Sequence, residues 1–367
     1  MKLFSKKSVT AVLSAAALLF TSCDSLADDV LVEPSDWSEG VMETPYYLMS
    51  SIGANMYISS DSLHLAWSDD GLTWTAFNSN GAVQTTNSGS NHYRDPSIFR
   101  LNDGTFVLLA ADFTSSGEIQ DLGSRSDLNY WGHPKSTIYV AFSNDLINWT
   151  KGHFLKLTEG TGKDGAVRHC WSPRAVYNKQ YKCYDIYWVG DNEEGVNEVY
   201  LTQTYDFYSV KSLKDNVIYS PGCSVINAAV VKSGSSYYLF ARDDDVDFAT
   251  GSGGDIQVAK SERWGKGFTR ISSDYINRVN GQFTPENVMY PCVYKLTDNK
   301  TWVMHVNKKN DPTTFSTYVT TDISDSSSWQ AASAADPALT FTLPGANIDT
   351  SVVMITQEEF DALDAVY

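Results

Sequence analysis

The sequence predicts an all-β fold, a five-bladed β-propeller closed by a C-terminal strand. Three observations lead to this prediction. A β-rich run followed by a small residue, a polar residue and an acidic residue recurs five times along the chain, often with a Trp close behind. An aromatic-rich strand precedes each copy. Turns rich in Gly, Asn and Asp bound the strand runs, and no long amphipathic helix interrupts them.

The repeats assign strands to successive blades. The recurring phrase occupies Leu63–Trp74, Tyr139–Trp149, Tyr200–Phe207, Ile256–Trp264 and Tyr318–Ile323. The preceding aromatic-rich strands are Tyr46–Ser50, Thr105–Ala110, Tyr184–Val189, Tyr237–Ala241 and Thr301–Val306. Because Trp74, Trp149, Trp264 and Trp329 repeat with this frame, we expect them in the core.

A further strand precedes four of these pairs and is predicted to be the innermost strand of its blade. These strands are Asp95–Leu101, Pro173–Tyr177, Val225–Val231 and Tyr290–Leu296. The first module lacks one, and Asp349–Ile355 at the far end of the chain could supply it and close the ring. The inner strands would then line a central channel, with their first residues at one mouth.

Charge and composition narrow the possible partners. The chain has 367 residues, a formal net charge of -17 and 42% hydrophobic residues, which is typical of a globular protein. Binding to nucleic acid or to an anionic membrane surface requires clustered Lys and Arg, so we expect neither. We expect a monomer with a neutral or cationic partner.

The N-terminal segment resembles a bacterial lipoprotein signal. Met1–Lys7 is basic, and Val9–Phe20 is apolar but short for a membrane span. Small residues then precede Cys23, which would carry the lipid. Residues 1–23 are therefore predicted to be the signal, 24–44 a tether and 45–367 one propeller domain. This implies an exported protein, periplasmic or at the cell surface, that meets the membrane only through Cys23. The alternative is an ordinary secretory signal with an incidental cysteine.

Two polar features bear on cofactors. Cys170 and Cys183 flank a predicted hairpin and could form a disulfide, although a buried free thiol is the commoner state, and the absence of a CxxC pair argues against zinc. The run Arg242–Asp245 could bind sugar hydroxyls through Asp243, or a calcium ion together with Asp247 and Asp255. The alternative is a solvated loop. We expect no cofactor and leave calcium open.

Short motifs at the inner strands resemble those of glycoside hydrolase family 43. That family has Arg-Asp-Pro, Trp-Ala-Pro-Glu, Ile-Asp, Glu-Gly-Pro and His-Gly at successive inner strands. This chain has Arg94-Asp95-Pro96, Trp171-Ser172-Pro173-Arg174, Ile226-Asn227, Met289-Tyr290-Pro291 and Asp349-Thr350. The resemblance extends over most of the chain from Tyr46 onward.

The resemblance implies inverting hydrolysis of plant-type glycans that contain arabinose or xylose. Such hydrolysis needs one ionised and one neutral carboxyl, about 6.5 to 9.5 Å apart. Asp95 matches the general base. Asn227 stands where the family has the Asp that tunes the acid, and Met289 stands where it has the general acid. Arg174 replaces a Glu and Asp349 a His. Most of the family's polar positions are therefore changed on an intact frame.

Several residues are candidates for the remaining roles. Glu286 could swing inward and replace the missing acid, with a solvated loop glutamate as the alternative. Asp95 could also be a structural acid that caps the turn before Pro96. Arg174 could bind the carboxylate of an acidic sugar. The predicted substrate-binding residues are Arg94, Trp171, Arg174, Asn227, Asp243, Met289, Tyr290 and Asp349.

A few aromatic residues and histidines complete the candidates. Trp131 lies in a long insertion and could stack on a sugar ring or simply anchor its loop. His305 lies in mid-strand and is expected to be a core residue. His92 and His169 precede inner strands and could reach the mouth, with nothing in the sequence to rank them.

Two functions follow, and the geometry of the mouth separates them. In the first, the protein is a hydrolase with Asp95 as base and Glu286 as a displaced acid. In the second, it is a propeller that holds a glycan in a cleft that has lost its acid. Glu286 across the mouth from Asp95 at hydrolase spacing favours the first. Met289 and Asn227 facing a pocket that is otherwise free of carboxylates favour the second.

Overall fold

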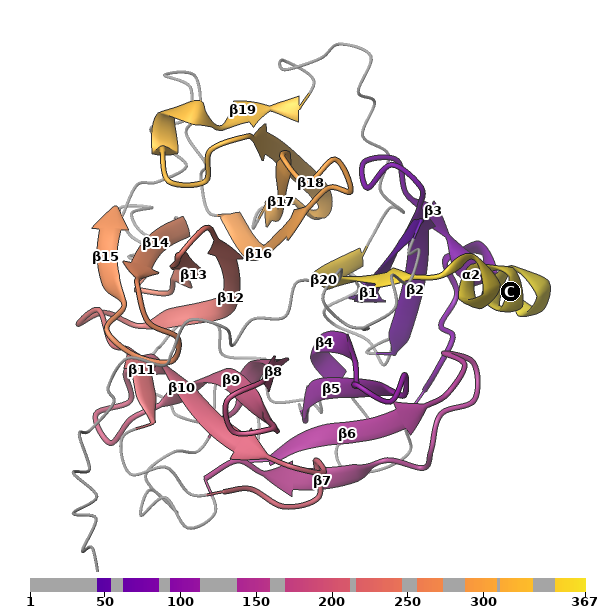
Figure 1. Cartoon of the computed structure of the whole chain (residues 1–367), viewed down its shortest axis with the longest axis horizontal. Helices are drawn as coiled ribbons and strands as arrows, with labels where there is room; N and C mark the ends of the chain where they lie inside the picture. Colours follow the sequence, from indigo (N-terminus) through magenta and orange to yellow (C-terminus); the bar gives the residue numbers. More distant parts are fainter. Residues whose placement is uncertain are drawn as a thin grey trace, which may run out of the picture.

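The computed structural model describes most of the chain from residue 45 onward. The described ranges are 45–53, 62–85, 93–112, 137–158, 169–211, 216–245, 256–272, 288–308, 311–332 and 347–367. Their strands form five four-stranded antiparallel sheets arranged in a ring, which confirms the predicted five-bladed propeller (Figure 1). The predicted signal and tether lie outside the described residues.

Each blade runs from an inner strand beside the propeller axis to an outer edge strand. Blade 1 contains β20 (Asn347–Ile355), β1 (Tyr46–Gly53), β2 (Leu63–Ser68) and β3 (Thr75–Ala76). Blade 2 contains β4 (Tyr93–Arg100), β5 (Phe106–Asp112), β6 (Thr137–Ser143) and β7 (His153–Lys156). Blade 3 contains β8 (Trp171–Asn178), β9 (Cys183–Asp191), β10 (Asn197–Thr204) and β11 (Val217–Tyr219). Blade 4 contains β12 (Val225–Ser233), β13 (Ser236–Asp243), β14 (Ile256–Ser261) and β15 (Thr269–Ser272). Blade 5 contains β16 (Val288–Lys295), β17 (Trp302–Lys308), β18 (Asp311–Thr320) and β19 (Gln330–Ala331).

The last strand of the chain closes the ring, as predicted. β20 pairs antiparallel with β1, from Tyr46 opposite Ile355 to Gly53 opposite Asn347. Blade 1 is thus built from both ends of the described chain. With β20 as its inner strand, blade 1 has four strands like each of the other blades.

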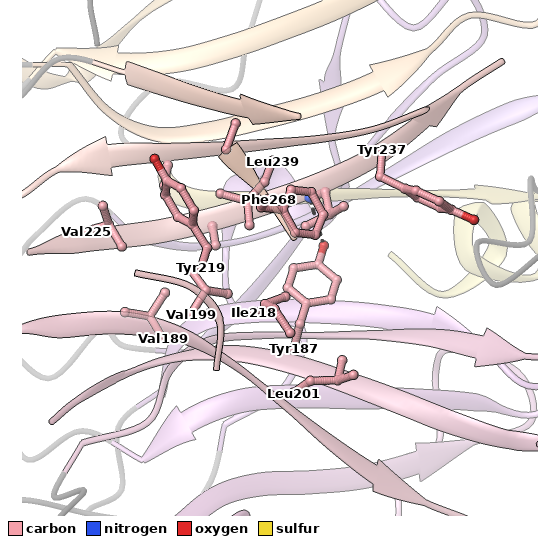
Figure 2. Packing of buried hydrophobic residues seen from close by; sticks show 14 of the residues in the cluster. Tyr187, Val189, Val199, Leu201, Ile218, Tyr219, Val225, Tyr237, Leu239 and Phe268 are labelled. Carbon is pink, nitrogen blue, oxygen red and sulfur yellow. Dashed lines mark hydrogen bonds between the residues drawn. The ribbon is translucent and has the colours of Figure 1, made fainter. Parts of the chain in front are cut away.

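The core lies between neighbouring blades because each sheet packs both of its faces. The cluster between blades 3 and 4 contains Tyr187, Val199, Tyr237 and Leu239 (Figure 2). Sheets buried on both faces read as continuous apolar runs in the sequence, and β5 is one such run, buried along its whole length. Of the repeated tryptophans, Trp74, Trp264 and Trp329 are buried, and Trp149 is half-buried against the core of blades 1 and 2.

The acidic residue of the recurring phrase organises a turn. In blade 2, Oδ1 of Asp145 accepts hydrogen bonds from the backbone N–H groups of Ile147 at 3.0 Å and Asn148 at 2.7 Å. Although burial acts in the opposite sense, these hydrogen bonds lower the pKa of Asp145 to about 2. Asp70 and Asp206 accept the same kind of bonds in blades 1 and 3. The repeat therefore encodes turns rather than a repeated binding site.

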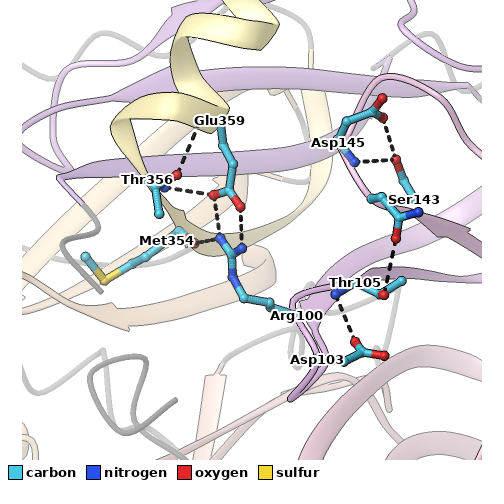
Figure 3. Close-up of polar contacts among 9 residues, drawn as sticks. Arg100, Asp103, Thr105, Ser143, Asp145, Met354, Thr356 and Glu359 are labelled. Carbon is cyan, nitrogen blue, oxygen red and sulfur yellow. Dashed lines mark hydrogen bonds and ion pairs between the residues drawn. The ribbon is translucent and has the colours of Figure 1, made fainter. Parts of the chain in front are cut away.

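A C-terminal helix that the sequence did not predict fastens blade 1 to blade 2. α2 (Gln357–Val366) begins with a capping box between Thr356 and Glu359. Glu359 also forms a two-pronged ion pair with buried Arg100 of β4 (Figure 3). The guanidinium carbon of Arg100 lies 4.2 Å from the centre of the Phe106 ring. Arg100 further donates to the carbonyl of Met354. The Thr-x-x-Glu capping pattern was readable in the sequence.

The cysteines in the described residues are free thiols. Cys170, Cys183 and Cys292 are buried and Cys223 is half-buried. The possible Cys170–Cys183 disulfide is therefore absent, and the buried-thiol alternative is confirmed for both residues. Burial raises the pKa of Cys183 to about 11, so its thiolate is disfavoured. Among the described residues, no helix is both long and apolar enough to cross a bilayer.

Replacing Glu359 tests the clamp made by α2. We expect Glu359→Gln to lower the free energy of unfolding by about 1.5 to 3 kcal/mol at pH 7, because buried Arg100 loses its charged partner. Against the effect of burial, the hydrogen bond from Arg100 lowers the pKa of Glu359. The ion pair therefore stabilises the fold above the unfolded-state pKa of about 4.3, and this stabilisation is lost as the pH falls further. Denaturant unfolding at several pH values measures the effect, and exposed Glu358→Gln is the matched control. Equal losses of stability in Glu359→Gln and Glu358→Gln would contradict the stabilising role assigned to the Arg100–Glu359 ion pair.

Candidate functional site

The same β-bulge interrupts the inner strand of every blade. Two inner-strand residues face a single residue of the neighbouring strand, and the pairing register shifts by one. The first bulge residue is always left-handed, with φ between +49° and +56°. The five bulges are Asp95-Pro96, Ser172-Pro173, Asn227-Ala228, Tyr290-Pro291 and Asp349-Thr350.

The bulge explains which residue types occur in these motifs. Asp and Asn tolerate the left-handed conformation better than other non-glycine residues. A proline can follow because the extra residue of a bulge is not required to donate to the ladder. Tyr290 has no such tolerance, so its backbone carries a cost of roughly 1 to 2 kcal/mol. The motifs therefore specify backbone shape as well as chemistry.

Asp95 is held as a hydrogen-bond acceptor by two other blades. Its Oδ2 accepts from the backbone N–H of Ser172 at 2.8 Å and from the Ser172 hydroxyl at 3.0 Å. Its Oδ1 accepts from Nδ2 of Asn227 at 3.1 Å. Burial raises the pKa of Asp95, while the charge of Arg174, the bonds from Ser172 and the charge of Arg94 oppose that shift. The donors around the carboxyl favour its ionised form.

Asp349 is the second buried carboxyl of the site, and its pKa is raised more strongly than that of Asp95. Its Oδ2 accepts the backbone N–H of Asp95 at 3.3 Å, and its Oδ1 is buried without a hydrogen-bond partner. Burial and the neighbouring charge of Asp95 raise the pKa of Asp349 well above its usual range, although Arg94 acts in the opposite sense. The pKa is raised for both carboxyls, and more strongly for Asp349, so the neutral form is favoured most at Asp349.

Tyr290 stands where the resembled family has a glycine and adds a half-buried ring to the site. The ring packs against the core of blades 1 and 2. Burial raises the pKa of Tyr290 well above its usual range, as does the charge of Asp349, while Arg94 and Arg242 oppose the shift. The phenol is therefore neutral and cannot act as a nucleophile near neutral pH.

Arg174 supports the backbone of neighbouring blades. Its guanidinium donates to the carbonyl of Pro96 at 3.4 Å and to the carbonyl of Thr350 at 3.1 Å. Both acceptors are the second residues of bulges, in blades 2 and 1. Arg174 therefore links three inner strands and contributes positive charge near Asp95.

A histidine–carboxylate pair lies at the start of β8, and it distinguishes His169 from the other candidate histidines. Nδ1 of His169 is 3.3 Å from Oδ2 of Asp191, and the backbone N–H of His169 donates to Oδ1 of Asp191 at 2.8 Å. The imidazole stacks on Trp171, with ring centres 5.7 Å apart. Nε2 is buried without a partner. Trp171 itself is buried in the core between blades 3 and 4.

The acidic run after β13 groups its side chains with a thiol. Carboxylate oxygens of Asp243 and Asp245 and Sγ of Cys223 lie within 4.8 Å of one another. Asp244 instead pairs with Arg242 at 3.1 Å. Calcium binds six to eight oxygen atoms, so two carboxylates beside a thiol do not make such a site by themselves. Asp247 and Asp255 lie outside the described residues.

His305 is a core residue, as expected. It is fully buried, and burial lowers its pKa to about 3. Its Nε2 lies 2.5 Å from the Tyr294 hydroxyl and its Nδ1 lies 2.7 Å from the Thr317 hydroxyl.

Four other candidates are not described. Glu286, Trp131 and His92 lie outside the described residues, and for Met289 only the backbone is described, opposite Asn307.

Comparison with known proteins identifies the family. Residues 44–361 match a family model for domains related to glycoside hydrolase family 43, described as "Probable glycosyl hydrolase domain". The chain belongs to this family. It is thus a glycoside hydrolase-like protein, and the motif resemblance seen in the sequence is confirmed at the level of the family. A search of curated proteins found no match.

Solved structures share the fold at low sequence identity. An endo-1,4-beta-xylanase from Bacteroides thetaiotaomicron aligns with a TM-score of 0.54 and 13% identity, covering 78% of this chain and 90% of that one. A family 43 β-1,3-galactosidase aligns with a TM-score of 0.54 and 11% identity, covering 80% of this chain and 59% of that one. A family 43 protein from Bacillus licheniformis aligns with a TM-score of 0.52 and 12% identity, covering 79% and 53%. At these identities the likeness shows the fold alone.

Substituting Asp349 tests the protonation of the carboxyl pair. We expect Asp349→Asn to be more stable than the wild type at pH 8, with the gain vanishing toward pH 4. The unfolded carboxyl loses its proton near pH 3.9, whereas the folded one keeps it, so wild-type stability falls as the pH rises through that window. Each pH unit of retained protonation costs about 1.4 kcal/mol.

Thermal unfolding from pH 4 to pH 8 checks this expectation. Asp95→Asn is the matched control, and it should be less stable than the wild type because an amide cannot accept hydrogen bonds at both of its ends. A stability difference between Asp349→Asn and the wild type that does not change with pH would contradict a raised pKa for Asp349.

Proposed function

We propose that this protein hydrolyses glycosidic bonds with inversion, with Asp95 as the general base. The observation that supports this proposal most directly is the set of three hydrogen bonds that Ser172 and Asn227 donate to the Asp95 carboxylate. A base that deprotonates water must be ionised and rigidly aimed, and donors from two neighbouring blades supply both conditions. Oδ1 accepts the hydrogen bond from Asn227 and has a lone pair left for a water molecule.

The reaction requires a second group that protonates the leaving oxygen. In the proposed cycle, Asp95 takes a proton from water as the water attacks the anomeric carbon, and an acid on the far side of the bond donates its proton to the departing oxygen. Met289 occupies the family's acid position and has no proton to give. We therefore assign the acid to Glu286, three residues earlier in the sequence.

The substrate class and location are part of the proposal. We propose plant-type glycans containing arabinose or xylose, in line with the resemblance of the inner-strand motifs to family 43. We further propose that Cys23 carries a lipid that anchors an otherwise monomeric protein outside the cytoplasm, with no nucleic-acid partner. The negative formal charge of -17 supports the last point.

A second candidate function is glycan binding without turnover. Tyr290 favours it, because a ring replaces the family's glycine next to Asp95 and Asp349. Asn227 favours it too, since an amide cannot provide the charge that the family's aspartate provides. Under this reading the site keeps its hydrogen-bonding frame and holds sugar hydroxyls.

Hydrolysis assays separate the two functions. Protein starting after Cys23 is incubated with arabinans, xylans and aryl glycosides, and released sugar is quantified. We expect Asp95→Ala and Glu286→Gln each to reduce the rate by about 10² to 10⁴-fold. Asp103→Ala, in the exposed turn after β4, is the control and should retain wild-type activity. Wild-type protein that binds these glycans and releases nothing would establish the second function instead.

Restoring the family motif tests the second function directly. If the wild-type site binds glycans without hydrolysing them, Met289→Glu combined with Tyr290→Gly should create measurable hydrolysis, because the two substitutions restore both the acid and the glycine of the family motif. Glycine also relieves the left-handed strain at position 290. Met289→Gln combined with Tyr290→Gly has the same shape without an acid and should stay inactive. Equal activity in the two double variants would show that position 289 supplies no proton.

A further inference from the structure

Exposed aromatic side chains gather on one part of the molecule. The described residues include six exposed large hydrophobic side chains, and four of them belong to blades 2 and 3. They are Phe154, Tyr181, Tyr205 and Tyr208, and the three tyrosines are 51% to 64% exposed. Soluble proteins rarely concentrate such residues without a partner.

Contacts join the three tyrosines, rather than Phe154, into one surface. Tyr208 stacks on His153 of β7 with ring centres 4.2 Å apart and planes within 6°. Phe154, the next residue along that strand, points to the opposite face of the sheet and lies against Tyr139. The turn that holds Tyr205 and Tyr208 leads to Lys211, whose Nζ lies 5.5 Å from the centre of the Tyr181 ring. Blades 2 and 3 lie side by side along one side of the ring (Figure 1).

The topology places this surface on the face opposite the candidate site. β8 begins next to the Ser172 bulge and runs to Asn178, so Tyr181 lies in the turn at its far end. β10 is antiparallel to β9 and ends at Thr204 on that same side, and Tyr205 and Tyr208 follow it. A ligand on this surface would therefore not contact Asp95.

The surface is basic, although the chain as a whole is strongly acidic. Exposed lysines lie next to the aromatic residues in the sequence, and we name the whole set the aromatic–basic surface. It comprises His153, Tyr181, Tyr205 and Tyr208 with Lys151, Lys179, Lys182 and Lys211. The acidic residue within this set is Asp206, whose carboxylate accepts hydrogen bonds from the backbone N–H groups of Tyr208 and Ser209. Positive charge thus dominates here in a chain with 44 acidic and 27 basic residues.

We propose that the aromatic–basic surface binds an anionic glycan, a chain of sugar rings that carry carboxylates. Flat tyrosine rings stack on the apolar faces of sugars, and their hydroxyls can bond to sugar hydroxyls. The lysines match the negative charges of the chain. An anionic membrane would be better served by Trp or by aliphatic side chains that insert among lipids, and this surface presents tyrosines instead. This second site would hold the polymer while the opposite face acts on another part of it.

Binding to polygalacturonate tests the proposal. Asp95→Ala protein starting after Cys23 is used so that turnover does not consume the ligand, and binding is measured by calorimetry or affinity electrophoresis. We expect saturable binding that weakens as salt rises from about 0.05 to about 0.5 M. Lys182→Glu with Lys211→Glu should weaken it by about tenfold or more, which is about 1.4 kcal/mol. Tyr205→Ala, which removes an exposed ring, should weaken it in the same sense.

Matched controls lie on the same molecule. Lys300→Glu reverses an exposed charge in the corresponding turn of blade 5, and Ile271→Ala removes an exposed side chain from blade 4. Both should bind like the parent. Undetectable binding of polygalacturonate, equal binding of neutral arabinan, or unchanged binding in the surface variants would overturn the proposal. So would binding to phosphatidylglycerol vesicles without binding to polygalacturonate. Because hydrolysis is not measured, failure here is distinct from failure of the proposed activity.

Discussion

The antiparallel pairing of β20 with β1 is the interaction on which the rest of the structure depends. It joins segments from opposite ends of the described chain and completes blade 1. It also brings Asp349 to within 3.3 Å of the Asp95 backbone, although the two residues are 254 positions apart. The carbonyl of Thr350, which accepts from Arg174, arrives on the same strand. The strand that closes the ring therefore also completes the site. The Arg100–Glu359 pair then secures this arrangement from outside, through α2.

The repeated left-handed bulge decides which side chains meet at the axis. A bulge aims one residue from each blade inward at the same level, so five positions share one environment while their chemistry is free to vary. Asp95 and Asn227 suit the bulge backbone and also supply an acceptor and a donor to each other. A residue at the first bulge position can therefore both favour the left-handed backbone and take part in the site through its side chain. Tyr290 suits neither the backbone nor the family pattern, which makes it the strongest sign that the site has been remade.

Much of the fold could be predicted because it is local and repeated. The alternation of turns with aromatic-rich strands was enough to predict the five blades. Because the first module lacks an inner strand, Asp349–Ile355 could be predicted to supply it. Observed inner strands differ from the predicted ones by a few residues at their ends, as with β8, which begins at Trp171 rather than Pro173. The strand ends shift because the bulge lies inside the ladder, not before it.

The site was predictable only at the positions that the motifs mark. Asp95, Asn227 and Asp349 were found because they stand at motif positions of the resembled family, and the structure brings them together. The role of Ser172 and the pairing of His169 with Asp191 depend on contacts through space, which no spacing along the chain reveals. Arg174 was expected to face a ligand, whereas its described hydrogen bonds go to backbone carbonyls of blades 2 and 1. The aromatic–basic surface was missed because its residues come from separate turns that only the fold joins.

The anomeric configuration of the first product tests the central claim most directly. If Asp95 activates water opposite the leaving group, proton NMR recorded during the reaction should show a released sugar whose anomeric configuration is inverted relative to the substrate. The inverted product should form before mutarotation mixes the anomers. Release with retained configuration would mean that a carboxylate attacks the sugar directly, and it would contradict the role assigned to Asp95.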